Sequence, residues 1–322
     1  MMEISKKAQL LMGAPMAGVS IKSFRILLKE CGADVVFTEM ISINGLFYNN
    51  TKTKKLLEFE EIERPIAIQL FGNKVELFRY AVEFILNSRF IPDIIDVNAG
   101  CPVKKIVSQG YGSALLKNPY LLGKIIEEVK NVVRDRNIKV SVKIRAGWDK
   151  NSINYKEVGK IAQEAGADFI TFHGRVRSQF YSGEANWDWI ADLNNYLEIP
   201  VVGNGDIFSV EDYLNVMNNY GISNVMIARG SLNNPCIFKQ IKDYIYTGEY
   251  KRLEPKERLD IILKHIKYLE KYNPEINVLP FFRKHLMWYI KNIRNAREFR
   301  EYITKENNLD KLKSKLIQIF DI

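Results

Sequence analysis

The first 244 residues repeat one pattern, in which short segments rich in Val and Ile alternate with longer amphipathic segments. Apolar runs of strand length followed by helix-length stretches are typical of βα units and a parallel sheet. The pattern predicts eight strands, at residues 9–16, 34–40, 66–72, 94–100, 140–147, 168–175, 200–206 and 225–231. Helices are predicted between them, for example at 74–87, 119–136 and 152–165. Eight such units predict an α/β fold, a (β/α)8 TIM barrel.

A doubly wound open sheet is the competing fold, but no Gly-x-Gly-x-x-Gly motif follows the first strand, which ends in Ala14-Pro15-Met16-Ala17. Nearly every predicted strand instead ends in a polar or glycine-rich cluster. In a TIM barrel these ends meet on one face, where enzymes of this fold build their active sites. We therefore sought functional residues at the strand ends.

The character of the chain changes after about residue 245, where no further Val-rich strand occurs. Residues 1–244 are predicted to form the barrel domain and residues 245–322 a small all-helical C-terminal domain. The second part holds 17 Lys and Arg against 11 Asp and Glu, and so carries +6 of the net charge of +9. A solvated helical surface and a nucleic-acid-binding surface both explain this charge.

Residues 281–300 are predicted to form one helix in this basic region. Lys291, Arg294, Arg297 and Arg300 recur on it at intervals of three residues, a spacing that keeps neighbours on one face. The expected result is a cationic ridge.

The three cysteines, Cys31, Cys101 and Cys236, are too few and too far apart for a disulfide framework or a metal site, so each is expected to act alone. Cys31 and Cys236 are interpreted as buried small hydrophobes. Cys101 lies in a tight turn before Pro102, just past a strand end, and is predicted to be a proton donor. His265 and His285 have no ligand partner at metal spacing, so no metal is expected.

The last two strands end in Gly203-Asn204-Gly205-Asp206 and Ala228-Arg229-Gly230. TIM barrels commonly bind a phosphate there, and Arg229 would add a charge-assisted contact. Either motif alone could be turn glycines with a surface arginine, but together they favour a phosphate site. Gln69 and Lys143 offer the amide and the cation that an isoalloxazine ring requires. A structural amide, a Schiff-base lysine and a structural cation are the alternatives for these two residues.

Four motifs together resemble one known family. They are Ala14-Pro15-Met16-Ala17-Gly18-Val19, Asn98-Ala99-Gly100-Cys101-Pro102, Gly110-Tyr111-Gly112-Ser113-Ala114-Leu115-Leu116 and Arg283-Lys284-His285-Leu286-Met287-Trp288-Tyr289. In this order, over essentially the whole chain, they resemble the tRNA-dihydrouridine synthase family, and within it the bacterial B-type branch.

The resemblance implies an FMN-binding barrel with Cys101 as general acid, followed by a helical tRNA-binding domain. The residues that it implies for FMN are Pro15, Met16, Ala17, Gln69, Lys143, His173, Asn204, Gly205, Asp206, Arg229 and Gly230. Candidate substrate contacts are Asn98, Arg145 and Arg175 in the barrel, and Arg283, Lys284, Lys291, Arg294, Arg297 and Arg300 in the tail.

The implied reaction uses NADPH or NADH to reduce FMN, transfers hydride to C6 of a uracil in tRNA, and protonates C5 from Cys101. A loop uridine is expected as the target, because extruding it costs least. Two alternatives are a flavin barrel that reduces a free small molecule, and a non-catalytic RNA-binding protein with a barrel scaffold. The first apolar stretch is broken by Gly13 and Pro15 and is too short for a membrane span, so we expect a cytoplasmic protein. A monomer is expected, because the separate tail already supplies a surface for RNA.

Overall fold

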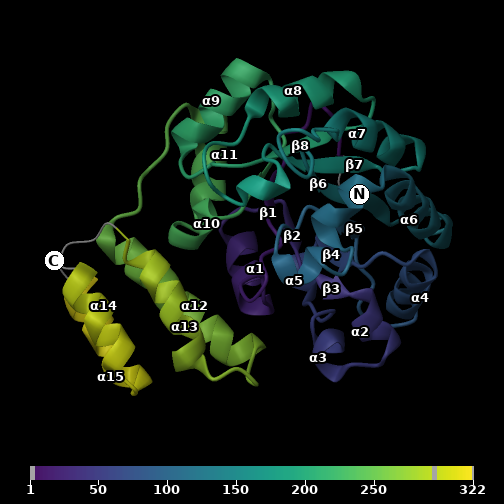
Figure 1. Ribbon diagram of the computed structural model, residues 1–322. Helices are drawn as coiled ribbons and strands as arrows, with labels where there is room; N and C mark the ends of the chain where they lie inside the picture. The colour runs from purple at the N-terminus through teal and green to yellow at the C-terminus, as the bar shows by residue number, and fades with distance from the viewer. Residues whose placement is uncertain (1–3, 292–295, 321–322) are drawn as a thin grey trace.

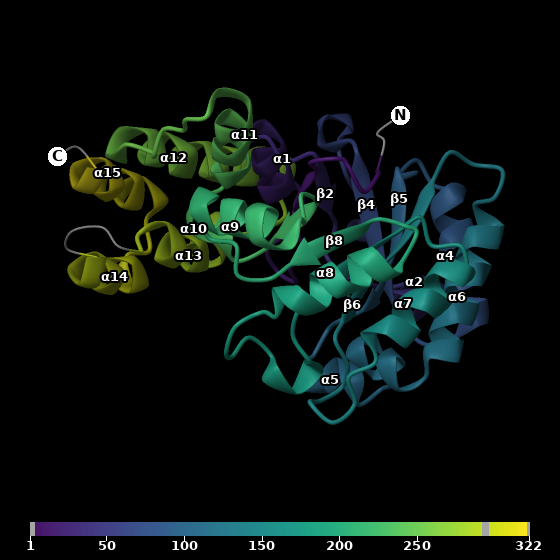
Figure 2. The same ribbon diagram turned by 90° about the horizontal axis from the view of Figure 1, so that it is seen from above.

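The chain folds around a closed ring of parallel strands with helices outside it (Figures 1 and 2). The computed structural model describes residues 4–291 and 296–320. Within these residues the ring consists of eight strands: β1 (Leu11–Gly13), β2 (Val35–Phe37), β4 (Ile66–Phe71), β5 (Ile94–Ala99), β6 (Lys139–Arg145), β7 (Phe169–His173), β8 (Val201–Asn204) and β9 (Val225–Ile227). β1 pairs with both β2 and β9, and β2 pairs with β4, which closes the ring.

All eight predicted strands are therefore confirmed, and the fold is the (β/α)8 TIM barrel with C-terminal helices. The strands are shorter than predicted, because their last residues turn into loops. A two-residue strand, β3 (Ile41–Ser42), was not predicted and pairs with β4.

Helices connect the strands, and two more follow the last strand, β9. Those before β9 are α1 (Lys22–Glu30), α2 (Ile43–Phe47), α3 (Thr51–Lys55), α4 (Val75–Leu86), α5 (Lys104–Val107), α6 (Pro119–Val132), α7 (Tyr155–Glu164), α8 (Trp187–Tyr196) and α9 (Val210–Tyr220), and those after it are α10 (Gly230–Asn233) and α11 (Ile237–Thr247). α4, α6 and α7 confirm the three helices predicted by range. Asn118 caps α6, where its side chain accepts from the Leu121 N–H at 3.1 Å and Pro119 fills the first turn.

The two-residue period of the strands decides what the ring encloses. One set of inward side chains is apolar and buried, and includes Val35, Ile94 and Phe169. Further along the same strands the inward positions become polar. Asn98 pairs in register with Lys143, and His173 with Asn204. The interior of the ring is therefore polar at the carboxyl ends of the strands and apolar below them.

Four further helices form the C-terminal part: α12 (Pro255–Tyr272), α13 (Val278–Tyr289), α14 (Ala296–Lys305) and α15 (Leu309–Phe320). They extend from the side of the barrel that carries α1 (Figure 1). Phe24 of α1 packs against His265 and His285, with ring centroids 5.4 and 5.9 Å apart. The predicted division at 244/245 falls inside α11, so the helices of the tail proper begin at Pro255. No helix among the described residues is long and apolar enough to cross a membrane.

The predicted single helix over 281–300 is wrong. α13 ends at Tyr289 and α14 begins at Ala296, so Lys291 lies just beyond α13, while Arg297 and Arg300 lie on α14. Arg294 falls outside the described residues. Phe299 and Ile303 of α14 are buried in the core, so α14 has an apolar face of its own to cover.

A candidate active site at the carboxyl end of the barrel

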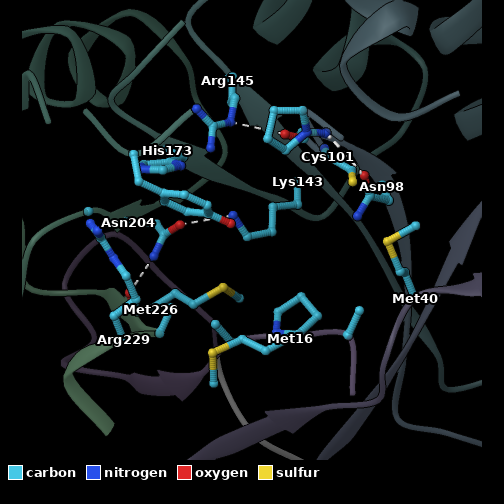
Figure 3. A pocket seen from close by; sticks show the side chains of 18 of the residues that line it. Met16, Met40, Asn98, Cys101, Lys143, Arg145, His173, Asn204, Met226 and Arg229 are labelled. Carbon is cyan, nitrogen blue, oxygen red and sulfur yellow. Dashed lines mark hydrogen bonds between the residues drawn. The ribbon is translucent and has the colours of Figure 1, made fainter. Parts of the chain in front are cut away.

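A cavity of about 390 Å³ opens at the carboxyl ends of the strands. This volume is within the range of small-molecule sites, roughly 300–1,000 Å³. The residues predicted from sequence that line it are Pro15, Met16, Ala17, Gln69, Asn98, Cys101, Lys143, Arg145, His173, Asn204, Gly205, Asp206, Arg229 and Gly230. Figure 3 shows Cys101 and Asn98 on one side, Arg229 on the other, and Lys143 between them. Strands far apart in sequence therefore build one site.

A chain of hydrogen bonds runs from the barrel interior to the turn that carries Cys101. The Gln69 Nε2 donates to Asp96 Oδ2 at 2.7 Å, and the Asn98 Nδ2 donates to Gln69 Oε1 at 2.7 Å. The Asn98 Oδ1 in turn accepts from the backbone N–H groups of Gly100 and Cys101, at 3.2 and 3.0 Å. Each of these buried side chains has a partner, as buried polar groups require.

Asp96 determines the direction of that chain. An ionised carboxylate can only accept, so the Gln69 amide must turn its NH₂ toward Asp96 and its oxygen toward Asn98. Asn98 must then turn its own oxygen toward the Cys101 turn. Burial raises the pKa of Asp96 to about 6, although hydrogen bonds from Ser141 and Gln69 oppose the rise. Asp96 is thus ionised at neutral pH. It was not among the predicted site residues, although it lies two residues before Asn98 on the same strand face.

The Cys101 thiol is half-buried in a tight turn. Asn98 holds the backbone N–H of Cys101, and the Cys101 carbonyl accepts from the Ser113 N–H at 3.0 Å. Gly112 has a φ of +59°, and a Cβ there would lie 2.9 Å from the Cys101 carbonyl oxygen, so glycine is required at this approach. Burial raises the pKa of Cys101, with the Val103 backbone and Arg145 opposing it. The thiol therefore keeps its proton at neutral pH.

Lys143 places a cation in the middle of the cavity. Its Nζ donates to Asn204 Oδ1 at 2.9 Å, and Asn204 Nδ2 donates to the Met226 carbonyl at 2.7 Å. Burial lowers the pKa of Lys143 to about 8, helped by the charge of Arg145. At neutral pH the amine is still largely protonated, with two further N–H groups to offer.

Asp206 organises the opposite end of the cavity. Its two carboxylate oxygens accept from Arg175 at 2.6 Å and from Arg229 at 2.7 Å. The Arg229 side chain remains 36% exposed and faces the cavity, so one of the two arginines is available to an anion. Gly205 and Gly230 bring the backbone close here, since a Cβ at Gly230 would lie 2.2 Å from the Ile207 carbonyl oxygen.

Arg175 was expected at the substrate, but it is buried and does not line the cavity. Its guanidinium donates to Asp206, to the Ser182 and Gly183 carbonyls, and to His173 Nε2 at 3.2 Å. Arg175 therefore fastens the loop after β7. His173 Nε2 must accept this bond, because a guanidinium has no acceptor. Burial and the charge of Arg145 hold the pKa of His173 well below its usual range, so the ring is neutral.

Arg145 lines the cavity and also connects its walls. Its Nε donates to the Gly100 carbonyl at 3.0 Å, and its Nη1 donates to the carbonyls of Val176 and Phe180 at 3.1 and 2.8 Å. It thus ties the Cys101 turn to the loop after β7. That loop places Tyr181 at the cavity, where Arg229 lies 4.9 Å from its ring centroid. Tyr181 and Phe208 also line the cavity, but loop residues of this kind carry no sequence period that would identify them.

The tail residues expected at the substrate make contacts within the chain. Arg283 donates to the Glu306 carbonyl at 2.7 Å and to Asn307 Oδ1 at 2.9 Å, which joins α13 to the end of α14. Lys284 donates to the Gly18 carbonyl, next to the Pro15–Ala17 wall of the cavity. The tail thus touches the segment that lines the site, and any contact of Arg283 or Lys284 with RNA stays a prediction.

Comparisons with known proteins show the family of this chain. A family model described as Dihydrouridine synthase (Dus) matches residues 12–321. The chain is 35% identical over 309 residues to a probable tRNA-dihydrouridine synthase of Rickettsia conorii, covering 95% of this chain and 92% of the relative. It is 34% identical over 308 residues to tRNA-dihydrouridine synthase B of Pseudomonas aeruginosa, covering 95% of this chain and 91% of the relative.

Solved structures share the fold. An amine oxidase that acts on 6-hydroxypseudooxynicotine, from Pseudomonas geniculata, matches with a TM-score of 0.57 at 14% identity, and the match covers 82% of this chain and 52% of that one. Histamine dehydrogenase from a Rhizobium species matches with a TM-score of 0.54 at 13% identity, covering 81% and 49%. The chain spans about half the length of each.

The buried charge of Asp96 predicts a pH dependence of stability. Its folded-state pKa of about 6 is above the value of ~3.9 in an unfolded chain. The folded protein therefore binds the Asp96 proton more tightly than the unfolded chain does. The stabilisation from this proton is fully present below about pH 4 and is lost as pH rises through about 6. Asp96→Asn removes this titration. In urea unfolding between pH 4 and 7.5, the wild type should lose stability relative to Asp96→Asn as pH rises, and a difference independent of pH would contradict the assignment.

Proposed function

Because the chain belongs to the dihydrouridine synthase family, we propose that it is a flavin-dependent enzyme that reduces uridines in tRNA to 5,6-dihydrouridine. One observation of the site carries the proposal: a thiol that keeps its proton, Cys101, lies at the same cavity as a buried cation, Lys143. Reduction of a carbon–carbon double bond needs a hydride and a proton. The Cys101 thiol at the cavity is suited to deliver the proton.

The residues at the cavity suit FMN. Arg229 and the close backbone at Gly205 and Gly230 are suited to its phosphate. Gln69 keeps one N–H free after its bond to Asp96, and Lys143 offers a cation for the pyrimidine edge of the ring. Pro15, Met16, Ala17, His173 and Asn204 would complete the walls. A reduced flavin, when bound, supplies hydride to C6 of the uracil.

The residues of the chain supply the rest of the chemistry. Cys101 donates a proton to C5 of the uracil, so that one hydride and one proton saturate the C5–C6 bond. Its raised pKa keeps the proton on sulfur until transfer. Asn98 and Arg145 hold the Cys101 turn through its backbone, and we propose that both contact the base. Tyr181 and Phe208 line the cavity, and their apolar rings would limit the access of water to the reacting carbons.

A uridine must leave its stack to enter the cavity, which costs a few kcal/mol and least in a loop. The basic tail would hold the RNA through phosphate contacts, with Lys291, Arg297 and Arg300 as candidates. NADPH or NADH as the reductant, and the monomeric state, stay predictions.

The first experiment records the visible spectrum of the purified protein and then measures dihydrouridine in unmodified tRNA after adding NADPH. We expect a flavin spectrum and dihydrouridine formation. A flavoprotein that leaves tRNA unchanged but reduces a free enone or dihydroorotate-type substrate would favour a small-molecule reductase. A colourless protein that binds tRNA would favour a non-catalytic RNA-binding protein.

Replacing Cys101 with Ala should slow dihydrouridine formation at least ~100-fold, because positioned general acids contribute about 10²–10⁴. The flavin content should stay unchanged, since the substitution removes only the thiol. Cys236→Ala, a thiol outside the cavity, is the matched control and should keep full activity. Full activity of Cys101→Ala would overturn the assignment of the acid.

Replacing Arg297 and Arg300 together with Ala should weaken tRNA binding at low salt and leave flavin occupancy intact. If both side chains bind phosphates, the slope of log K against log salt should fall by roughly 0.7–0.9 for each arginine–phosphate ion pair removed. Lys124→Ala with Arg136→Ala removes the same charge from an exposed part of the barrel near α6, away from α14 (Figure 1). Equal effects of the two double variants would mean that α14 has no specific role.

A further inference from the structure

Two cysteines far apart in sequence lie in contact at the junction of α1 and α11. The Sγ atoms of Cys31 and Cys236 are 2.9 Å apart across a separation of 205 residues. Cys31 follows the last residue of α1, and Cys236 precedes the first residue of α11. The two thiols, which were interpreted from the sequence as separate small hydrophobes, are therefore neighbours, and only Cys31 is fully buried.

The backbone holds the two helix ends together. The Lys239 N–H in the first turn of α11 donates to the Cys31 carbonyl at 2.9 Å. Gly32, with a φ of +93°, permits this approach, because a Cβ there would lie 3.1 Å from the Lys239 nitrogen. A disulfide needs its sulfur atoms ~2.05 Å apart, so the pair must approach by less than about 1 Å. This is a small side-chain movement.

We propose that Cys31 and Cys236 are an oxidation site, at which a low-molecular-weight disulfide converts the two thiols into a bond between the first and last helices of the barrel. In a reducing compartment the dithiol prevails, and the bond forms under oxidising conditions. The proposal does not depend on the proposed function, because neither residue lines the cavity.

The two thiols have different environments, which determines which sulfur attacks the reagent disulfide first. Cys236 is half-buried, whereas Cys31 is buried, with 6% of its surface exposed. The contact with Cys31 lowers the pKa of Cys236, with Lys239 and Lys264 adding to the effect and burial opposing it. The same contact, together with burial, raises the pKa of Cys31. Cys236 is thus the attacking sulfur.

The exchange balances in two steps. The Cys236 thiolate attacks the reagent disulfide, whose S–S bond breaks and releases one thiol. Cys31 then loses its proton and attacks the mixed disulfide on Cys236, which releases the second thiol and forms the Cys31–Cys236 bond. The protein loses two electrons and two protons, and the reagent disulfide is reduced to two thiols.

The bond would fix α1, the barrel helix whose Phe24 packs against His265 and His285 of the tail. It would also close a loop of 205 residues in the unfolded chain, which restricts that chain and favours the folded one. The oxidised protein should therefore have a higher midpoint of thermal unfolding, which a reducing agent returns to its first value.

The test incubates the whole folded protein with oxidised glutathione, blocks the remaining thiols, and maps linked peptides by mass spectrometry. We expect one linked pair, Cys31 with Cys236, in the wild type. Cys101→Ser is the matched control and should retain this pair, whereas Cys31→Ser and Cys236→Ser should lack it. If a serine variant fails to fold, the wild-type peptide map still shows whether Cys31 and Cys236 become linked.

Three outcomes would overturn the proposal. They are a stable glutathione adduct on Cys236 without a linked peptide, a linked pair that includes Cys101, and a Cys31–Cys236 link that forms only in denaturant. An unchanged midpoint of unfolding after complete oxidation would overturn the stabilising role, because the bond would then not restrict the unfolded chain.

Discussion

Closure of the strand ring is the constraint on which the functional contacts depend. β2 pairs with both β1 and β4, so the sheet has no free edge between them and every strand presents alternate residues to one interior. The parallel register then sets Asn98 beside Lys143 and His173 beside Asn204. An open sheet with the same strands would spread these residues along a line, and Lys143 could not lie between Cys101 and Arg229.

The enclosed polar groups lower the stability of the folded protein, but they fix the orientation of the side chains at the site. Asp96 has no access to water, and its carboxylate is stabilised by hydrogen bonds from Gln69 and Ser141 at 2.7 and 2.6 Å. In return it gives one orientation to two amides and, through Asn98, to the backbone of the Cys101 turn. A carboxylate that is unfavourable for stability at neutral pH is in this way useful for positioning a thiol.

The helical tail is connected to the barrel at its active end. α12 and α13 pack on α1 through Phe24 and two buried histidines, and the pKa values of His265 and His285 are lowered by burial to about 3 and about 2. The packed rings therefore stay neutral at neutral pH. Lys284 then reaches the carbonyl of Gly18, in the segment that follows the Pro15–Ala17 wall. RNA held by the tail would be placed beside the cavity rather than at a distance from it.

The sequence by itself determined the barrel, its eight strands and most of the cavity lining, because strand period and strand-end composition are local properties. Tertiary structure decided what depends on contacts between distant segments. Arg175 does not line the cavity, because its guanidinium donates hydrogen bonds to Asp206 and to two loop carbonyls. The tertiary structure divided the predicted helix at 281–300 into α13 and α14, and α14 buries Phe299 and Ile303 in the core. It also brought Cys31 to Cys236, since only ring closure places the first helix against the last.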